Sequence, residues 1–390
     1  MRIVLFSDTY PPEINGVATS IFNLYTTLKN HGHSVLVVTT NPFSNAVTFE
    51  NDIVRIPGIE LKKLYNYRMA YFFNQSAYNI IKEFKPDILH INHDAGIGQF
   101  GFIVGSMLKI PTAYTLHSMY EDYAYYLTKG HFDRAARGAV KYYIKAKANS
   151  TGQLIVPSVK IKDYLRSIGV DDFINVVPTG IDFSKYFVNE KSLETRKRIK
   201  KELGLAENDF VILSLGRVAK EKSIDICLKG YAEFMNKYKN ESVKMVIVGG
   251  GPYLDELKGL ASSLGMENKV IFVGPVSPDR TQDYYWIGDL FISASTTETQ
   301  GLTFMEAMAS SLPVLARFDD NLTGTIDDGM TGYFFFEKKD LPDKLDSIIK
   351  NKKERETVVK NALKALDAYS LKKFYENIIG VYNRAIKAEW

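Results

Sequence analysis

The stretch DLFISASTTETQGLTFMEAMASSLPVLAR, Asp289–Arg317, changes from a strand pattern to a helix pattern and back. The apolar run DLFISAS predicts a buried strand, LTFMEAMASS predicts the helix that follows it, and LPVLAR predicts a second strand. The segment between the first strand and the helix is rich in threonine and ends at Gly301, which indicates a loop. A strand–helix–strand order of this kind is typical of a parallel sheet covered by helices.

The same alternation extends over the whole chain. The first half contains seven strand candidates: IVLFS, VLVVTT, DIVRI, DILHI, PTAYTLH, QLIVPS and INVVPTG. The second half contains six: FVILSLG, VKMVIVGG, KVIFVG, DLFISAS, LPVLAR and TGYFFF. We therefore predict an α/β protein with two doubly wound, Rossmann-like parallel-sheet domains that face a cleft. The charged segment 189–208 is expected to hold a helix and the domain junction.

The composition narrows the class of protein. The chain has 390 residues, of which 45% are hydrophobic and 24% charged, as in soluble proteins with more than one domain. The single cysteine, Cys227, cannot form an intrachain disulfide, so a reducing cytosol is expected. The start MRIVLFSDTY reads as a strand rather than a signal peptide, and no run of about eighteen apolar residues occurs. Residues 1–180 hold 18 basic and 14 acidic residues, and this difference of 4 equals the whole net charge of +4, too small an excess to predict nucleic acid binding.

Two glutamates, Glu298 and Glu306, lie on either side of Gly301. On one continuous helix their side chains would be about 80° apart, whereas a bend at Gly301 lets both border one pocket at the start of the helix. The backbone amides of Gly301, Leu302 and Thr303 would point into that pocket and could bind a phosphate. For Glu306 alone, a helix carboxylate favoured by the macrodipole is the simpler interpretation.

Further anion-binding residues follow predicted strands. LGRVAKEKS places Arg217 and Lys222 after the first strand of the second half, where a guanidinium and an ammonium suit a diphosphate. SDTYPPEINGVATS places Gly16 just before a helix, where a phosphate can approach the backbone. A solvated loop and an ordinary turn are the alternatives for these two places. No Asp-x-Asp pattern and no close pair of metal-ligating histidines occurs, so no metal site is predicted.

GIGQFG, residues 96–101, matches the dinucleotide fingerprint G-x-G-x-x-G. That fingerprint normally follows the first strand of its domain, whereas several strands precede it here. A nicotinamide-dependent oxidoreductase is therefore only a minor alternative. His117 ends the strand PTAYTLH, where a residue of the cleft would lie, and it precedes the aromatic and acidic stretch SMYEDYAYYL.

Two basic stretches lie in the first half. Arg134, Arg137, Lys141 and Lys145 have helical spacing and share one face, and like charges at this spacing repel unless an anionic partner relieves them. LKKLYNYRMAYFF mixes Lys62, Lys63 and Arg68 with aromatic residues. Cations beside aromatic residues suit an anionic membrane surface, and a solvated protein surface is the alternative.

The chain resembles the retaining glycosyltransferases of the two-domain GT-B fold that carry the E-x7-E motif. The resemblance rests on NGVATS, TLHSMYEDY, VPTGID, GRVAKEKS, VGGGP and ETQGLTFMEAMASSLPV and covers nearly the whole sequence. Many members have phenylalanine where this chain has Gln300, and ETQGLT with HSMYEDY is similar to the branch that glucosylates diacylglycerol at bacterial membranes. HINHDAGIGQFG departs from that branch on the acceptor side.

The resemblance implies a role for each of these residues. Glu298 would hold the hydroxyls of the donor sugar, and Glu306 would hold the ribose. Arg217 and Lys222, with Gly16 and the amides of Gly301, Leu302 and Thr303, would neutralise the diphosphate. The backbone near Val276 would meet the uracil, and His117 would lie beside the reacting sugar carbon.

The resemblance also implies an overall function. The expected enzyme transfers glucose or another hexose from a UDP-sugar to a membrane lipid such as diacylglycerol, forms an α-glycolipid and needs no cofactor. It would be cytoplasmic and attached to the inner face of the membrane. Residues 1–188 would bind acceptor and membrane, residues 189–369 the nucleotide sugar, and the helix of residues 370–390 would return to the first domain. A soluble sugar acceptor and a catalytically silent sugar-nucleotide binding module are the alternatives.

Overall fold

The computed structural model describes residues 1–13, 15–61, 67–117, 133–149, 151–296, 298 and 301–388. These residues form two compact units: the first unit comprises Met1–Ile181 together with Tyr369–Trp390, and the second unit comprises Asp182–Ala368. The division falls after Ile181, ahead of the predicted boundary at residue 188. Residues 182–188 belong to the second unit because Trp286 there donates its indole N–H to the carbonyl of Tyr186 at 2.7 Å.

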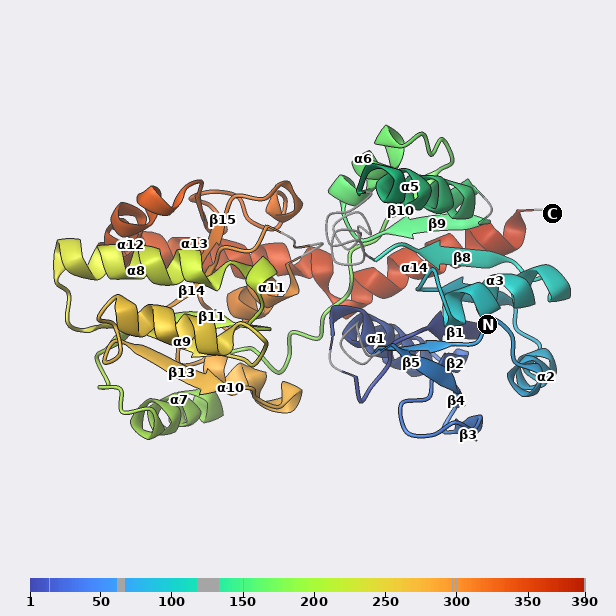
Figure 1. Cartoon of the computed structure of the whole chain (residues 1–390), viewed down its shortest axis with the longest axis horizontal. Helices are drawn as coiled ribbons and strands as arrows, with labels where there is room; N and C mark the ends of the chain where they lie inside the picture. Colours follow the sequence, from blue (N-terminus) through green and yellow to red (C-terminus); the bar gives the residue numbers. More distant parts are fainter. Residues whose placement is uncertain are drawn as a thin grey trace. The chain divides into compact units, whose positions relative to one another are not determined.

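The first unit is built on an eight-stranded sheet (Figure 1). Its strand order is β10-β9-β8-β7-β1-β2-β4-β3, and every pair is parallel except the edge pair of β3 and β4. The strands are β1 (Arg2–Ser7), β2 (Ser34–Thr40), β3 (Thr48–Glu50), β4 (Ile53–Ile56), β7 (Ile88–Ile91), β8 (Thr112–Thr115), β9 (Gln153–Val156) and β10 (Ile174–Val176). All seven strands predicted in the first half are present. The short edge strand β3 was not predicted.

Helices cover both faces of this sheet because alternate strand residues point to opposite sides. Val4 and Phe6 of β1 pack with α2 (Gln75–Phe84), α3 (Ile97–Leu108), α5 (Asp133–Asn149) and α6 (Val159–Ser167). Ile3 and Leu5 pack with α1 (Gly16–Asn30) and α14 (Leu371–Lys387). The last helix therefore lies on the first unit, with Phe374, Ile378, Val381, Tyr382 and Ala385 buried at helical spacing.

A separate hairpin of β5 (Gly58–Leu61) and β6 (Tyr67–Ala70) follows β4 in the chain. It includes part of the aromatic and basic stretch that was predicted to meet a membrane. Gly58 is required in it because a Cβ there would lie 2.6 Å from the carbonyl oxygen of Met69.

The second unit contains a six-stranded, fully parallel sheet in the order β13-β12-β11-β14-β15-β16. Its strands are β11 (Phe210–Leu215), β12 (Val243–Val248), β13 (Val270–Gly274), β14 (Leu290–Ser293), β15 (Val314–Arg317) and β16 (Tyr333–Phe335). These are the six strands predicted for the second half, and the parallel-sheet fold class is confirmed. Hydrophobic strand residues buried from both sides account for the near-continuous apolar runs.

The helices of the second unit also form two layers (Figure 1). One face of the sheet packs against α8 (Ile224–Tyr238), α9 (Leu254–Ser263) and α12 (Leu341–Lys350), with Cys227 buried among them. On the other face, Phe291 of β14 packs between Tyr285 of α10 (Thr281–Tyr285) and Phe304 of α11 (Leu302–Ala309). The unit is completed by α7 (Glu190–Glu202), the helix predicted in the charged segment, and α13 (Lys352–Ala365).

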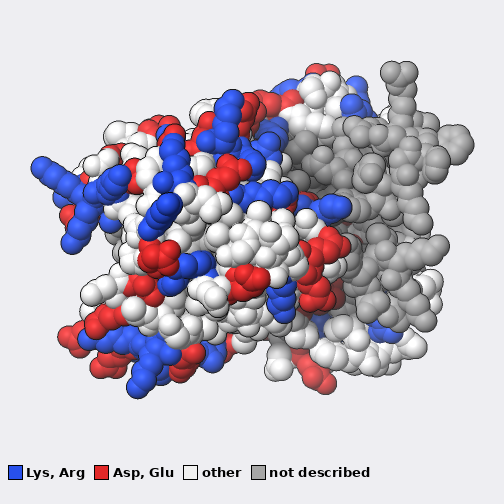
Figure 2. All heavy atoms as spheres, turned by 60° about the vertical axis from the view of Figure 1, so that its left-hand side comes forward, with Lys and Arg blue, Asp and Glu red and all other residues white. Residues whose placement is uncertain are grey.

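The surface of the second unit carries charges of both signs. In the view of Figure 2, lysine and arginine side chains alternate with aspartate and glutamate side chains over the face that is turned forward. This agrees with the sequence of the second unit, residues 182–368, which holds 27 basic and 29 acidic residues. Mixed charges of this kind favour solubility over binding to a polyanion.

Candidate active site

Gly301 makes the turn from the loop after β14 into α11. Its φ of 72° and ψ of 47° are left-handed, and a Cβ would lie 2.5 Å from Leu322. Glu298 therefore lies in the loop, while Glu306 lies in the helix, as predicted from the sequence. Leu302 and Thr303 are the first two residues of α11, so their amides face the N-terminal end of this helix. This end adjoins the carboxyl end of β14, where parallel sheets bind ligands.

An ion pair connects Glu298 to the loop after the neighbouring strand. Lys222 lies in a short 3₁₀ turn that follows β11, and its ammonium is 2.7 Å from Oε1 of Glu298. The Glu298 side chain is only 13% exposed and that of Lys222 30%. Arg217 is more exposed, and its guanidinium pairs with Glu221 in the same turn. Both residues that were predicted to bind the diphosphate thus come from the loop after β11. Lys222 also contacts Glu298, the carboxylate that was predicted to bind the donor sugar.

Glu306 lies beside two tyrosines that the sequence did not single out. The hydroxyl of Tyr285 donates to Oε2 of Glu306 at 2.9 Å. Burial raises the pKa of Glu306, while hydrogen bonds from Tyr186 and Tyr285 act in the opposite direction. Nothing in the local sequence indicated these partners, because Tyr186 is 120 residues before Glu306 in the chain (306 − 186).

Glycines allow the loops at this edge of the sheet to approach each other closely. Gly249 follows β12 with a φ of 139°, and a Cβ there would lie 1.8 Å from the carbonyl oxygen of Gly216, after β11. Gly251 also has no room for a side chain, because a Cβ there would lie 2.2 Å from the carbonyl oxygen of Val218. Val276 lies partly buried in the loop after β13 at the same edge. The VGGGP stretch thus forms tight backbone contacts rather than a nucleotide-cradling P-loop.

In the first unit, Gly16 is the first residue of α1. The N-cap Asn15 accepts a hydrogen bond from the amide of Ala18 at 2.8 Å, which fixes the start of this 15-residue helix. Gly16 is exposed there. A helix start without a bulky side chain provides backbone amides that a phosphate can approach.

His117 lies just beyond β8, among buried polar residues at the carboxyl ends of the strands. Its Nε2 is 3.2 Å from Oδ1 of Asn92, whose Nδ2 donates to the carbonyl of His90. Burial lowers the pKa of His117 to about 3, with smaller contributions from His93 and His90. His117 is therefore a neutral imidazole that donates from Nε2 at neutral pH.

The glycines of residues 96–101 serve packing. A Cβ at Gly98 would lie 1.7 Å from the carbonyl oxygen of His93, and one at Gly101 would lie 2.9 Å from the Phe6 ring. The start of α3 already faces an acid, because the amide of Ile97 donates to Oδ1 of Asp8 at 2.7 Å. A carboxylate at this helix end repels a pyrophosphate, so the dinucleotide interpretation of this motif is not supported.

The structure describes only some of the residues that were predicted to bind a membrane. Lys62 and Lys63 lie outside the described residues, and so do the side chains of Arg134 and Arg137, although both belong to α5. Lys141 is exposed beside Tyr142, which is 77% exposed.

Of two other predicted membrane cations, Arg68 makes a hydrogen bond within the first unit, and Lys145 lies beside the C-terminal end of α6. Arg68 donates to the carbonyl of Asn41 at 2.9 Å and is partly buried. The ammonium of Lys145 lies 2.8 Å from the position that a Cβ on Gly169 would take, at the C-terminal end of α6. The described part of the chain contains no helix long and apolar enough to cross a membrane.

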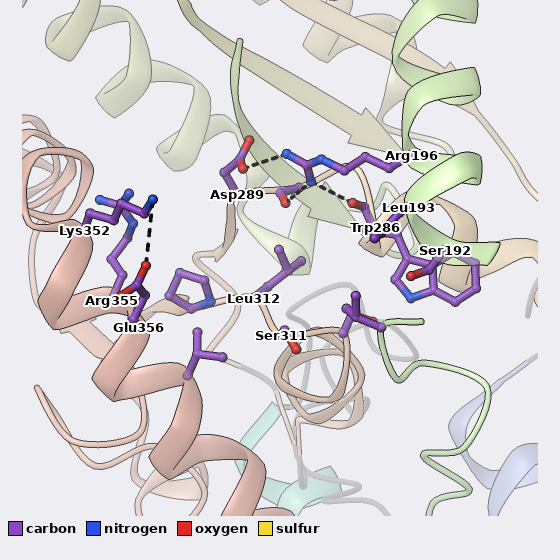
Figure 3. A pocket seen from close by; sticks show the side chains of 15 residues that line it. Ser192, Leu193, Arg196, Trp286, Asp289, Ser311, Leu312, Lys352, Arg355 and Glu356 are labelled. Carbon is purple, nitrogen blue, oxygen red and sulfur yellow. Dashed lines mark hydrogen bonds and ion pairs between the residues drawn. The ribbon is translucent and has the colours of Figure 1, made fainter. Parts of the chain in front are cut away.

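A cavity of about 410 Å³ lies elsewhere in the second unit, between α7, α13 and the turn before β15 (Figure 3). Its wall contains Arg196, which donates to Asp289 at 2.7 Å and to the carbonyls of Trp286 and Gly288. Asp289 directly precedes β14, so the cavity lies at the amino end of the sheet, opposite the edge that holds Glu298. Among the described residues, no cluster of three or more histidine, cysteine or acidic side chains could hold a metal ion.

Two family models match this chain. Residues 14–185 match glycosyltransferase family 4, and residues 195–365 match glycosyl transferases group 1. The chain is 37% identical over 342 residues to an alpha-monoglucosyldiacylglycerol synthase of Streptococcus pneumoniae. This match covers 87% of this chain and 76% of that protein. The chain is a family 4 glycosyltransferase. The enzyme of the same name from Acholeplasma laidlawii is 35% identical over 369 residues, with 93% of this chain and 92% of the relative covered.

Solved glycosyltransferase structures share the fold of this family 4 enzyme. Sucrose-phosphate synthase from Thermosynechococcus elongatus superimposes with a TM-score of 0.78 over 100% of both chains at 18% identity. Anabaena Alr3699/HepE in complex with UDP and glucose superimposes with a TM-score of 0.74 over 98% of this chain and 99% of that chain, also at 18% identity. The GT-B fold is thereby confirmed, and the oxidoreductase alternative is set aside.

Proposed function

We propose that this enzyme transfers a hexose, glucose in the first place, from a UDP-sugar to a membrane lipid such as diacylglycerol and forms an α-glycolipid. The names of the two bacterial relatives support this acceptor class, and UDP with glucose in the related Anabaena structure supports the donor. The observation that carries the donor assignment is the placement of Glu298, Glu306 and Lys222 around the start of α11.

Each group at the start of α11 suits one part of the donor. Glu298, buried against Lys222, would accept hydrogen bonds from sugar hydroxyls, and Glu306 would accept those of the ribose. Lys222 and Arg217 would meet the diphosphate once it competes with their present carboxylate partners, helped by the amides of Gly301, Leu302 and Thr303 and by Gly16. The loop at Val276 would contact the uracil.

The proposed reaction breaks the bond between the anomeric carbon and the β-phosphate oxygen. The acceptor oxygen forms its new bond to that carbon on the same face, and its proton passes to the departing phosphate oxygen. Lys222, Arg217 and the helix end stabilise the charge that develops on UDP. His117, neutral and donating from Nε2, would lie beside the sugar as a hydrogen-bonding group rather than as a base.

The diphosphate site is proposed to work without a metal ion, because two side-chain cations and a helix end already supply positive charge. Turnover in EDTA equal to turnover in Mg²⁺ would support this proposal. A loss of more than about tenfold in EDTA, restored by Mg²⁺, would contradict it.

The decisive experiment is a transfer assay of radiolabelled UDP-glucose and UDP-galactose against diacylglycerol vesicles and soluble sugars. Labelled lipid from UDP-glucose is expected, and Glu298→Ala is expected to lower its formation strongly while the circular dichroism spectrum is unchanged. Transfer to soluble sugars alone would replace the lipid acceptor with the alternative, and near-normal transfer by Glu298→Ala would remove the donor assignment.

We also propose that the basic face of α5 attaches the enzyme to the cytoplasmic leaflet of the membrane. Exposed Lys141 and Tyr142 support this, since cations beside aromatic residues favour anionic interfaces. Charge reversal at Arg134, Arg137, Lys141 and Lys145 should abolish sedimentation with vesicles rich in anionic lipid. A control reverses four exposed lysines of the second unit and should leave sedimentation unchanged; these are Lys237, Lys339, Lys350 and Lys352.

A further inference from the structure

Two buried tyrosines converge on Glu306. Tyr285 ends α10 and is fully buried, and its hydroxyl donates to Oε2 of Glu306 at 2.9 Å. Tyr186 is 2% exposed, and its hydroxyl lies near enough to the same carboxylate to lower the pKa of Glu306. The two rings also pack edge to face, with their centroids 5.8 Å apart. Neither hydroxyl is explained by core packing, since a phenylalanine would fill the same space.

The surrounding fold fixes both tyrosines. The carbonyl of Tyr186 accepts from the indole N–H of Trp286 at 2.7 Å, so the segment that carries Tyr186 is tied to the residue after Tyr285. Tyr285 also packs on Phe291 of β14. Because backbone and rings are held, the two hydroxyl groups have little freedom to leave Glu306.

The tyrosines also decide what Glu306 can bind. Burial raises the pKa of Tyr285 well above its ordinary value, so this phenol stays protonated and can only donate toward the carboxylate. A carboxylate has about four lone-pair positions, and the Tyr285 hydroxyl occupies one of them. The remaining positions can accept hydrogen bonds from two adjacent hydroxyl groups of a ligand.

We propose that Tyr285 and Tyr186 are positioning residues that orient Glu306 as an acceptor for two neighbouring hydroxyls, and that they thereby select ribonucleotide donors over 2′-deoxyribonucleotide donors. This inference rests on the proposed role of Glu306 in binding the ribose. It adds a discrimination that Glu306 performs only while the tyrosine hydroxyls hold it in place.

Calorimetric titration of the full chain with UDP and with 2′-deoxy-UDP tests the proposal. The wild type should bind UDP roughly 10- to 100-fold more tightly, as expected for one hydrogen bond to a charged group. Tyr285→Phe and Tyr186→Phe should each reduce this ratio at least about threefold. Tyr231→Phe removes a buried hydroxyl that donates to the carbonyl of Val243 in the same unit, and it should leave the ratio unchanged.

The outcomes separate this inference from the assignment on which it rests. Equal weakening of both nucleotides in Tyr285→Phe and Tyr186→Phe would mean that the tyrosines are only structural, and this would overturn the inference. Glu306→Gln should bring the ratio close to one. If that ratio stays at the wild-type value, or if the wild type itself does not discriminate, the ribose role of Glu306 fails as well.

Discussion

The ion pair of Lys222 and Glu298 allows stability and catalysis to be separated. In Lys222→Met, Glu298 keeps its charge in a place where only 13% of the side chain is exposed, but it loses the ammonium at 2.7 Å. Breaking a fully buried ion pair costs about 3–5 kcal/mol, whereas an exposed pair contributes about 0–1 kcal/mol. For this partly buried pair we expect the second unit to lose about 2 kcal/mol of unfolding free energy.

A loss of this size is measurable by thermal denaturation. In a unit of this length, 1 kcal/mol shifts the Tm by about 2–4 °C, so Lys222→Met should lower it by about 4–8 °C. The double variant Lys222→Met with Glu298→Gln removes both charges and should recover most of the Tm. Activity should behave differently, because the loss of a group that stabilises developing charge lowers kcat by about 10²–10³.

The test is a comparison of Tm and of glucosyl transfer for the wild type, both single variants and the double variant. We expect the double variant to be nearly as stable as the wild type and nearly inactive. If its Tm is as low as that of Lys222→Met, the pair does not determine the stability in the way described. If transfer returns together with the Tm, Lys222 and Glu298 act on the fold and not on the donor.

Three further outcomes are expected. The pKa of His117 is about 3 in the folded chain and about 6.5 in the unfolded chain, so protonation of the unfolded chain should lower stability as the pH falls below 6.5. Urea titrations at pH 7.5 and pH 5 should show that His117→Gln loses less unfolding free energy between these two pH values than the wild type does. Gly249→Ala should lower the free energy of unfolding by more than about 3 kcal/mol, because the added Cβ meets a carbonyl oxygen. Gly259→Ala lies inside α9, where the added Cβ has open space, and it should raise the free energy of unfolding by about 0.5–1 kcal/mol. Chemical denaturation measures both changes. Tyr382→Phe should destabilise the first unit by about 1–3 kcal/mol, because Nδ1 of buried His90 loses its partner at 2.7 Å; an unchanged midpoint would contradict this.

The strands could be predicted because each carries its own signal. Parallel strands buried on both faces need continuous apolar residues, and all thirteen predicted runs are strands. Strands β3, β5 and β6 were missed because none of them is a continuous apolar run, since they include Glu50, Glu60 and Arg68. The loop position of Glu298 and the helical position of Glu306 also followed from the sequence, since Gly301 marks the bend between them.

The partners of these residues could not be predicted, because a hydrogen bond depends on distance in space and not along the chain. Tyr186 and Tyr285 approach Glu306 from a connecting segment and a short helix, and no sequence pattern linked either tyrosine to that glutamate. The sequence by itself determined the α/β class and the strand order along the chain, and it supplied the residue types of the proposed donor site. Only the tertiary structure decided which side chain faces which carboxylate, because packing of the α10 and α11 helices on β14 sets those distances.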